Sequence, residues 1–286
     1  MRSTRGMFFF PLWVSMLLNA GCSKAEPQKT ADIEGQRTGL PVQAAGTEAQ
    51  ESSYTVFLRR ILKEAEIPPE PAGHIEAAAA EGPAFLLDLL TVLEGDPYLR
   101  VLVDKAHALE AGYEPEDLVE LRDGAYQVSR GGLLLRRTAR AALEEMAAAA
   151  RADGISLRVS SAYRSYTYQE TVYERNVRES GQETADRESA RPGHSQHQLG
   201  LVVDFDPIDD SFAVSEAGPW VAAHAPAFGW SLSYPQGYEA LTGYRWESWH
   251  YRYVGRDLSD FIERYFQGIQ QYALRFIYQW EKAGGL

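Results

Sequence analysis

The residues best suited to chemistry lie in the segment 191–206, which reads Arg-Pro-Gly-His-Ser-Gln-His-Gln-Leu-Gly-Leu-Val-Val-Asp-Phe-Asp. Proline and glycine interrupt its first half, which predicts a loop, whereas 200–205 is an apolar, β-branched run that predicts a buried strand. His197 precedes this strand and Asp204 lies near its far end. An imidazole and a carboxylate placed in this way can converge on one cation.

A third candidate ligand and a candidate base follow in 246–250, which reads Trp-Glu-Ser-Trp-His. With His250, the set of two histidines and one carboxylate matches a common catalytic zinc site that leaves one position open for water. Zinc lowers the pKa of such a water to about 7, and Glu247 is the candidate base beside it. Positions 247 and 250 of a regular strand face opposite sides. Glu247 must therefore lie in a turn before the strand, or a bulge must intervene.

A positive group for a carbonyl oxygen or a substrate carboxylate is available in 160–165, which reads Ser-Ser-Ala-Tyr-Arg-Ser. Arg164 in this segment follows a predicted half-buried strand at 155–160. Arginine is always charged and can bind a carboxylate through two parallel hydrogen bonds. We therefore expect Arg164 to reach the substrate.

Composition limits the remaining possibilities. The chain has 286 residues, 45% of them apolar, which is enough for one large domain or two small ones. Its formal net charge of −12 argues against nucleic acid as a general partner.

The N-terminus predicts export. Residues 1–21 combine two arginines with a short apolar stretch and small residues, as a signal peptide does. Leu-Asn-Ala-Gly-Cys at 18–22 resembles the bacterial lipoprotein cleavage box, in which Cys22 would carry a lipid. A polar tether follows at 22–53. We expect a protein of the cell envelope, held at the membrane through Cys22 and facing the periplasm or cell wall. An ordinary signal peptide with an inert cysteine is the alternative.

The rest of the chain predicts an α+β fold, with a small antiparallel sheet, flanking helices and a preceding helical region. The segment 54–95 is the helical region, either a separate preface or a layer packed on the main domain, and 96–286 is that main domain. Further strands are predicted at 99–103, 230–234 and 244–254, and one long amphipathic helix at 257–280.

Several ordered motifs between about residues 98 and 265 resemble the zinc D-alanyl-D-alanine carboxypeptidases of the vancomycin-resistance (VanY-like) type. The main ones are Ser195-x-His197-x-x-Gly200-x-Val202-x-Asp204 and Glu247-x-Trp249-His250. Others are Ser-Ala-Tyr-Arg-Ser at 161–165 with Gln169, Val-Asp-Lys-Ala-His at 103–107, Ser-Ala-Arg-Pro-Gly-His-Ser at 189–195 and Tyr-Arg-Tyr-Val-Gly at 251–255.

The resemblance implies an enzyme that removes the terminal D-alanine from peptidoglycan stem peptides, with its metal in a cleft. Zinc would bind His197, Asp204 and His250, and Glu247 would act as general base and then acid. Arg164 would steady the carbonyl oxygen in the transition state. The substrate end would be held by three further side chains, Ser195, Gln169 and Ser161.

The sequence departs from the family pattern at several positions. Val202 replaces a usual alanine, which makes the layer beneath the metal bulkier, and Ser248 replaces a usual proline. Asp104 replaces a common asparagine. These changes leave the predicted ligands and base in place and concern substrate preference and loop rigidity.

Other functions fit the same residues. An L,D-carboxypeptidase acting on tetrapeptide stems would use the same metal site, and so would an endopeptidase that cuts cross-links. A peptidoglycan-binding lipoprotein without turnover is an alternative of another class. Pocket shape separates these possibilities, and the sequence does not give it.

Overall fold

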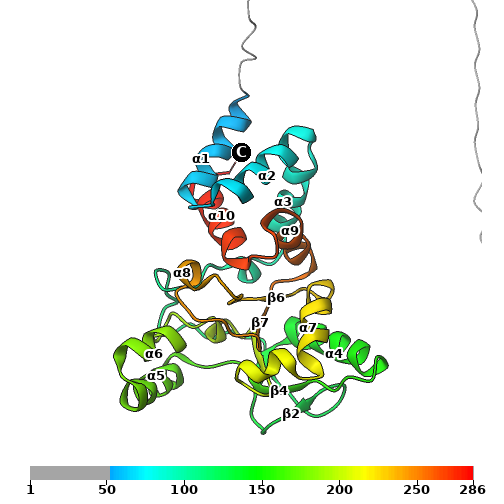
Figure 1. The fold of residues 1–286 in the computed structure, drawn as a ribbon, viewed down its shortest axis with the longest axis vertical. Helices are drawn as coiled ribbons and strands as arrows, with labels where there is room; N and C mark the ends of the chain where they lie inside the picture. The colour runs from blue at the N-terminus through cyan, green and yellow to red at the C-terminus, as the bar shows by residue number, and fades with distance from the viewer. Residues whose placement is uncertain (1–51, 286) are drawn as a thin grey trace, which may run out of the picture. The chain divides into compact units, whose positions relative to one another are not determined.

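The computed structural model describes residues 52–285. The predicted signal peptide at 1–21, Cys22 and most of the tether predicted at 22–53 lie outside the described residues. Among the helices of 52–285, none is long and apolar enough to cross a membrane. This part of the chain has the predicted α+β fold, with helices around a small sheet (Figure 1).

A five-stranded sheet carries the middle of the fold, and its pairing is antiparallel except between its first two strands. Its order is β2 (Gln127–Val128), β4 (Arg158–Ser161), β5 (Val202–Phe205), β7 (His250–Tyr253) and β6 (Trp230–Leu232). The strands predicted at 155–160, 200–205 and 230–234 are thus present as β4, β5 and β6. A separate pair joins β1 (Leu118–Glu120) to β3 (Leu134–Arg136).

The two faces of this sheet differ because side chains alternate along each strand. Val203 and Phe205 of β5 and Tyr251 of β7 belong to one apolar core, to which α4 (Arg137–Ala152) contributes a stripe of alanines, Leu143 and Met146. Asp204 and His250 alternate with these residues and therefore face the other side. The core fixes which residues point toward the site.

A second core lies in a helical cluster formed by both ends of the described chain, α1–α3 with α9 and α10 (Figure 1). Its helices are α1 (Ser53–Glu64), α2 (Pro69–Glu81), α3 (Ala84–Glu94), α9 (Arg256–Phe266) and α10 (Gln270–Lys282). Buried residues of all five helices form one cluster. The early helices are thus a layer packed on the C-terminal helices. The domain limits 54–95 and 96–286 stay a prediction.

At the other end of the view in Figure 1, α5 and α6 lie on one side and α4 and α7 on the other, and α8 lies between this end and the helical cluster. Besides α4, these are α5 (Tyr166–Ser180), α6 (Gln182–Glu188), α7 (Ala217–His224) and α8 (Glu239–Thr242). Short 3₁₀ turns join them, at η1 (Pro97–Arg100), η2 (Gln196–Leu199), η3 (Asp210–Val214) and η4 (Ala225–Phe228).

The single helix predicted at 257–280 is wrong, because the chain forms α9 and α10 with a break between them. Gln267 ends α9 in the left-handed region at φ 55°, and Gly268 follows at φ 74°. The apolar period continues through the break because both helices face the same core. Periodicity alone therefore did not reveal the turn.

The strand predicted at 99–103 is also wrong. This segment forms η1 and then an extended stretch without a strand partner among the described residues. Its carbonyl oxygens at Leu99 and Val101 accept hydrogen bonds of 3.0 and 2.9 Å from the Nη2 group of Arg252, which is fully buried. The Arg252 guanidinium thus provides the hydrogen-bond donors that a neighbouring strand would otherwise supply to these carbonyls.

Candidate metal centre and catalytic site

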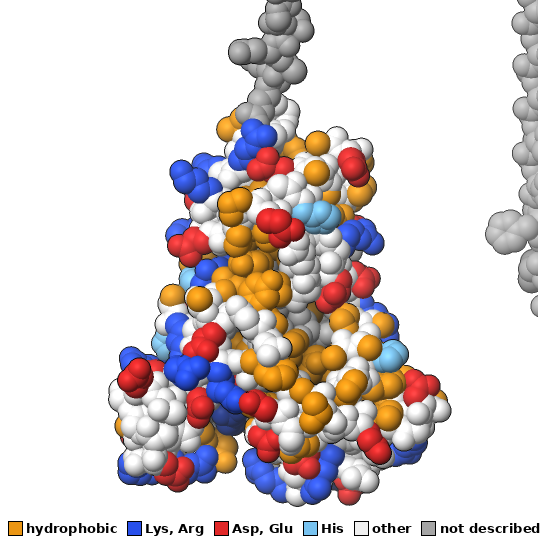
Figure 2. All heavy atoms as spheres, viewed as in Figure 1, with side chains coloured by type: hydrophobic (Ala, Val, Ile, Leu, Met, Phe, Trp, Pro, Cys, Tyr) orange, Lys and Arg blue, Asp and Glu red, His pale blue; other side chains and the backbone are white. Residues whose placement is uncertain are grey.

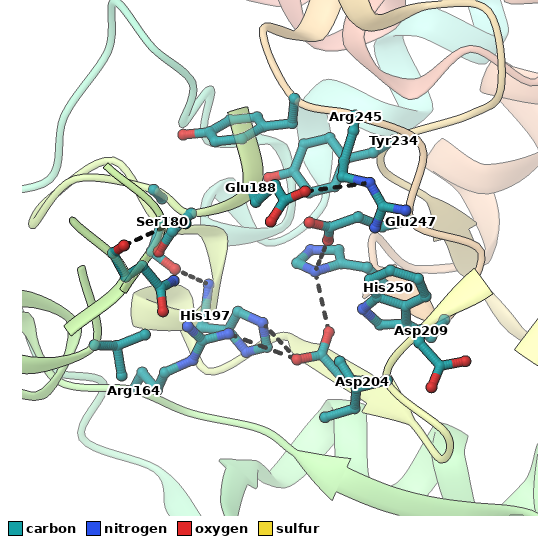
Figure 3. Close-up of a pocket in the computed structure, with 18 of the residues that line it drawn as sticks. Arg164, Ser180, Glu188, His197, Asp204, Asp209, Tyr234, Arg245, Glu247 and His250 are labelled. Atoms are coloured by element: carbon teal, nitrogen blue, oxygen red, sulfur yellow. Dashed lines mark hydrogen bonds and ion pairs between the residues drawn. The ribbon is translucent and has the colours of Figure 1, made fainter. Parts of the chain in front are cut away.

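His197, Asp204 and His250 meet at one buried point between η2, β5 and β7 (Figure 3). One ligand atom from each residue lies within 4.8 Å of the others. All three residues are at most 4% exposed, so any ion held there would be largely removed from water. The structure thus brings together the three ligands that the sequence predicted.

Strand register explains this convergence. Asp204 of β5 is paired directly with His250 of β7, and side chains at such antiparallel pairs are immediate neighbours. His197 returns to the same point through η2, which ends at Gly200 in the left-handed conformation with φ 66°. The amide of Gly200 donates to the His197 carbonyl at 3.1 Å and closes this turn. A loop and two strands therefore supply one ligand each.

The donor atoms of the two histidines are suited to a cation. His197 Nδ1 lies 2.6 Å from the Ala162 carbonyl, so it carries the proton and leaves the Nε2 lone pair bare. This Nε2 is 3.1 Å from Asp204 Oδ2, and His250 Nδ1 is 3.1 Å from Oδ1. Among the described residues, His197 Nε2 and Asp204 Oδ1 have no partner with hydrogen-bond geometry. Two imidazole nitrogens and one carboxylate, all turned toward the same point, fit zinc.

Burial and neighbouring charges shift the pKa values of the two histidines in opposite directions. Burial and the charge of Arg164 lower the pKa of His197 to about 4. Burial acts against protonation of His250 as well, but hydrogen bonds to Asp204 and Glu247 outweigh it and raise the pKa of His250 to about 9. A ligand nitrogen must lose its proton to bind a metal ion, so metal binding at His250 would compete with its protonation.

Glu247 occupies the place that the sequence required of a base. It lies in the turn directly before β7, with the His250 amide donating to the Glu247 carbonyl at 3.2 Å. Its carboxylate Oε2 is 3.3 Å from His250 Nδ1. Glu247 also lines a cavity of about 400 Å³, together with the three candidate ligands. The prediction that Glu247 precedes the strand is confirmed.

Arg164 lines the same cavity from the segment after β4, and Figure 3 shows its guanidinium beside the Asp204 carboxylate. Its Nη2 is 3.5 Å from Asp204 Oδ2, and its Nη1 donates to Gln169 Oε1 at 2.8 Å. Gln169 is fully buried, and its Nε2 donates to the Ala190 carbonyl at 2.6 Å. Gln169 does not line the cavity and is placed to hold Arg164, whereas the sequence predicted that it holds substrate.

The two predicted serines have different positions. Ser195 lines the cavity and caps η2, with its Oγ accepting from the His197 amide at 3.3 Å. The hydroxyl hydrogen of Ser195 is then free to point at a ligand. Ser161 lies on β4, where its backbone pairs with Asp204, and it does not line the cavity. The structure thus favours Ser195 over Ser161 as a contact for substrate.

The outer wall of the cavity was not predicted from the sequence. Figure 2 shows the surface hollowed between the α5–α6 segment and the part that carries β4. Side chains from α5, α6 and two loops line this wall, namely Val172, Asn176, Glu179, Ser180, Glu188, Ile208, Asp209 and Arg245. No helix was predicted at 182–188, so nothing in the sequence indicated that Glu188 would line the cavity. Arg245 lies two residues before Glu247, and this proximity was the available signal.

Sequence comparison finds a matching family and several relatives. The family is the D-alanyl-D-alanine carboxypeptidase VanY, whose sequence model matches residues 132–256. The D-alanyl-D-alanine carboxypeptidase of Enterococcus faecalis is 32% identical over 222 residues, which cover 73% of this chain and 79% of that protein. The matched family segment contains every candidate site residue named above.

Solved structures share the fold. The LdcB LD-carboxypeptidase is 34% identical with a TM-score of 0.53, and the match covers 59% of this chain and 85% of that one. A variant of the D,D-pentapeptidase VanY from a VanB-type resistance cassette, solved in complex with Zn(II), is 30% identical with a TM-score of 0.51. That match covers 61% of this chain and 98% of the other.

Proposed function

Since the chain belongs to the VanY family of D-alanyl-D-alanine carboxypeptidases, we propose that it is a zinc-dependent D,D-carboxypeptidase. Its substrates are peptidoglycan stem peptides, from which it removes the terminal D-alanine. The main structural support is that His197, Asp204 and His250 converge on one cavity. Glu247 and Arg164 line the same cavity. Zinc is the cation proposed for the three ligands, in keeping with the Zn(II) complex of the related VanY variant.

When bound, zinc would polarise the substrate carbonyl and make a nearby water more acidic. Glu247 is placed to take the proton of the attacking water, because its carboxylate lies 3.3 Å from the ligand nitrogen of His250. The same carboxylate then delivers the proton to the leaving amine of D-alanine. This sequence of transfers needs one carboxylate at the rim of the ligand set, and Glu247 is that carboxylate.

Arg164 is proposed to stabilise the negative charge that develops on the carbonyl oxygen. Its guanidinium lies at the cavity wall 3.5 Å from Asp204, so its positive charge is in place before the reaction begins. Its hydrogen bond to Gln169 reduces the freedom of the long side chain. Ser195 is proposed to donate its hydroxyl to the carboxylate of the terminal D-alanine.

The test is hydrolysis of defined stem peptides. We expect the purified protein to shorten a pentapeptide stem by one D-alanine, as seen by mass spectrometry, and to lose this activity after chelation. Retained activity in fully chelated protein would contradict the proposal. Binding of the stem peptide without cleavage would instead support a non-catalytic peptidoglycan-binding protein, against which intact Glu247 and Arg164 argue.

An L,D-carboxypeptidase is the second candidate, and the likeness to the LdcB LD-carboxypeptidase favours it. The same assay distinguishes the two functions when tri-, tetra- and pentapeptide stems are compared side by side. Loss of the last residue from the tetrapeptide, with the pentapeptide left intact, would support the L,D activity. Cleavage of cross-linked dimers would indicate an endopeptidase.

We also propose that the protein is exported and held at the envelope through a lipid on Cys22. The basis is the sequence at 18–22 and the polar stretch that separates it from α1. We expect Cys22→Ser to move the protein from the membrane fraction to the soluble fraction of the producing cell. A mature protein with an unmodified, water-soluble N-terminus would contradict the anchor.

A further inference from the structure

Three buried glutamines lie behind the metal ligands. Gln196 is 2% exposed, Gln270 1% and Gln271 4%. Gln196 adjoins the ligand His197, whereas the other two begin α10, outside the segment 132–256 that matches the family. A buried side-chain amide is costly without hydrogen bonds, so the partners of these amides indicate what they hold in place.

Gln196 faces the ligand His250 from behind. Its Oε1 lies 3.4 Å from His250 Nε2 and accepts from Ser233 Oγ at 2.7 Å. Its Nε2 donates to Gln270 Oε1 at 3.4 Å, and Gln270 Nε2 donates to the Ser231 carbonyl at 3.2 Å. A continuous chain of polar contacts therefore leads from α10 through Gln196 to the ring of His250.

The direction of these contacts matters for metal binding. His250 Nδ1 is the nitrogen that faces Asp204, so its lone pair is free for a metal only when the proton resides on Nε2. A carbonyl oxygen opposite Nε2 favours that tautomer, whereas an amide NH₂ group there would favour the wrong one. Outer partners of this kind orient a ligating histidine and fix its tautomer.

We propose that Gln270 is a positioning residue for the metal site. From α10 it holds the Gln196 amide with its oxygen toward His250, and Gln196 in turn sets the tautomer and ring orientation of this ligand. This inference rests on the proposed function, because it assumes a metal at His250. It assigns a role in the site to a helix outside the family match.

The helical cluster gives α10 the rigidity that this role requires. Ala273, Phe276 and Ile277 of α10 are fully buried among helices that include α1, α3 and α9. The first turn of α10 thereby keeps its place behind the sheet. Gln271, the next residue, donates to Asp104 Oδ2 at 2.7 Å and makes no hydrogen bond to Gln196 within the described part of the chain. It is therefore a matched control for loss of a buried amide on the same helix turn.

The experiment measures zinc affinity of the folded protein by competition with a chromophoric chelator, for Gln196→Leu, Gln270→Leu, their double variant and Gln271→Leu. We expect Gln196→Leu to weaken zinc binding by about 10- to 100-fold, as removal of an outer partner does. Gln270→Leu should weaken it by at least about 3-fold, and the double variant should match Gln196→Leu, because one residue acts through the other. Gln271→Leu should retain the affinity of the unaltered protein.

A second measurement is the visible spectrum of the Co(II)-substituted protein, which reports ligand geometry independently of turnover. We expect Gln270→Leu to change it and Gln271→Leu to leave it unchanged. Unaltered zinc affinity in Gln270→Leu, multiplying losses in the double variant, or equal losses in Gln270→Leu and Gln271→Leu would each overturn the inference. If a leucine variant does not fold, the corresponding methionine variant keeps the unbranched side chain and is tested in its place.

The outcome is separable from the proposed function. Failure of the unaltered protein to bind zinc would contradict the proposed function itself. Tight zinc binding that is indifferent to Gln270 and Gln196 would contradict only the positioning role.

Discussion

Two charged side chains, Arg164 and Glu247, lie on different sides of the candidate metal site. Arg164 lies beside Asp204, whereas Glu247 lies beside His250 at the start of the turn before β7. The guanidinium is held by Gln169, whereas the Glu247 carboxylate lines the cavity. These roles predict different kinetic consequences for substitutions at the two positions.

Glu247→Gln removes the base and keeps the size and polarity of the side chain. We expect turnover to fall by about 10²- to 10⁴-fold, which is the usual contribution of a general base. Zinc content should stay unchanged, because His197, Asp204 and His250 remain in place. Product formation from a pentapeptide stem and metal analysis of the same sample check both points. Substantial residual turnover, or loss of zinc, would show that Glu247 has another role.

Gln169→Leu distinguishes holding the substrate from holding Arg164. If Gln169 acts through Arg164, kcat should fall by about 10-fold with KM nearly unchanged, because the interaction lost is one made in the transition state. Direct contact with substrate would raise KM instead. Arg164→Ala serves as the reference, with an expected loss of about 10²- to 10³-fold in kcat. The measurement is steady-state kinetics on the same stem peptide.

Among the elements, the turn from η2 into β5 bears most directly on the site. Gly200 lies between His197 and Asp204 at φ 66°, and a Cβ added there would lie 2.8 Å from Leu118 Cδ2 and 3.1 Å from Arg136 Cγ. Backbone conformation and side-chain packing both favour glycine at this position. The glycine of the sequence motif is thus explained by the turn that it permits.

Gly200→Ala should therefore destabilise the protein and displace the first ligand. The left-handed conformation alone costs an alanine about 1–2 kcal/mol, and the close contacts add to this. Gly237→Ala is the control, since Gly237 has φ 86° with nothing within 4 Å of an added Cβ. We expect a clearly larger fall in Tm for Gly200→Ala than for Gly237→Ala, and weaker zinc binding only in the former. Equal effects would mean that the contacts with Leu118 and Arg136 are harmless.

Across the whole molecule, the helical cluster and the sheet are connected by continuous chain and by contacts. β7 leads through a short turn into α9, and Arg252 of β7 donates to the carbonyls of Leu99, in η1, and Val101, just after it. The first turn of α10 reaches both Asp104 and Gln196. A substitution that disrupts the helical cluster should therefore also affect the candidate metal site.

Phe85→Ala tests the cooperativity of this arrangement. Phe85 of α3 is fully buried, and its ring lies 4.9 Å from that of Tyr265 and 5.8 Å from that of Phe276. We expect a loss of about 3–5 kcal/mol in the free energy of unfolding, with a single transition shared by helix and sheet signals. Leu87→Ala, at an exposed position of the same helix, should change stability by less than about 0.5 kcal/mol. Separate transitions would indicate independent domains.

Asp104 predicts part of the acid sensitivity. Burial acts to raise the pKa of Asp104, but hydrogen bonds from the His107 side chain and from the amides of Ala106 and His107 outweigh it and lower the pKa. Because the folded-state pKa lies below the unfolded one, this stabilisation is complete above about pH 4 and is lost as the pH falls through the folded value. In thermal scans, Asp104→Asn should be less stable than the unaltered protein at pH 7, and the difference should shrink toward pH 3. A gap that is constant with pH would exclude this linkage.

The candidate ligands, the candidate base and the turn that carries the base could all be predicted from the sequence. The resemblance to the VanY-like carboxypeptidases joined two distant pairs of residues. His197 with Asp204, and Glu247 with His250, each combine suitable residue types at a short spacing, and the turn before β7 follows from strand geometry. Local rules of this kind depend on neighbouring residues only, so they are available without a fold. The strands at 155–160, 200–205 and 230–234 were found for the same reason.

Only the tertiary structure decided what depends on contacts between distant segments. Gln169 is anchored by the Ala190 carbonyl, 21 residues away in the sequence, and Gln270 reaches Gln196 across 74 residues. The break between α9 and α10 was hidden because both helices face one core. The segment 99–103, which was predicted as a strand, instead offers two backbone carbonyls to the guanidinium of Arg252. Sequence spacing determined which residues do the chemistry, and long-range packing decided which residues hold them in place.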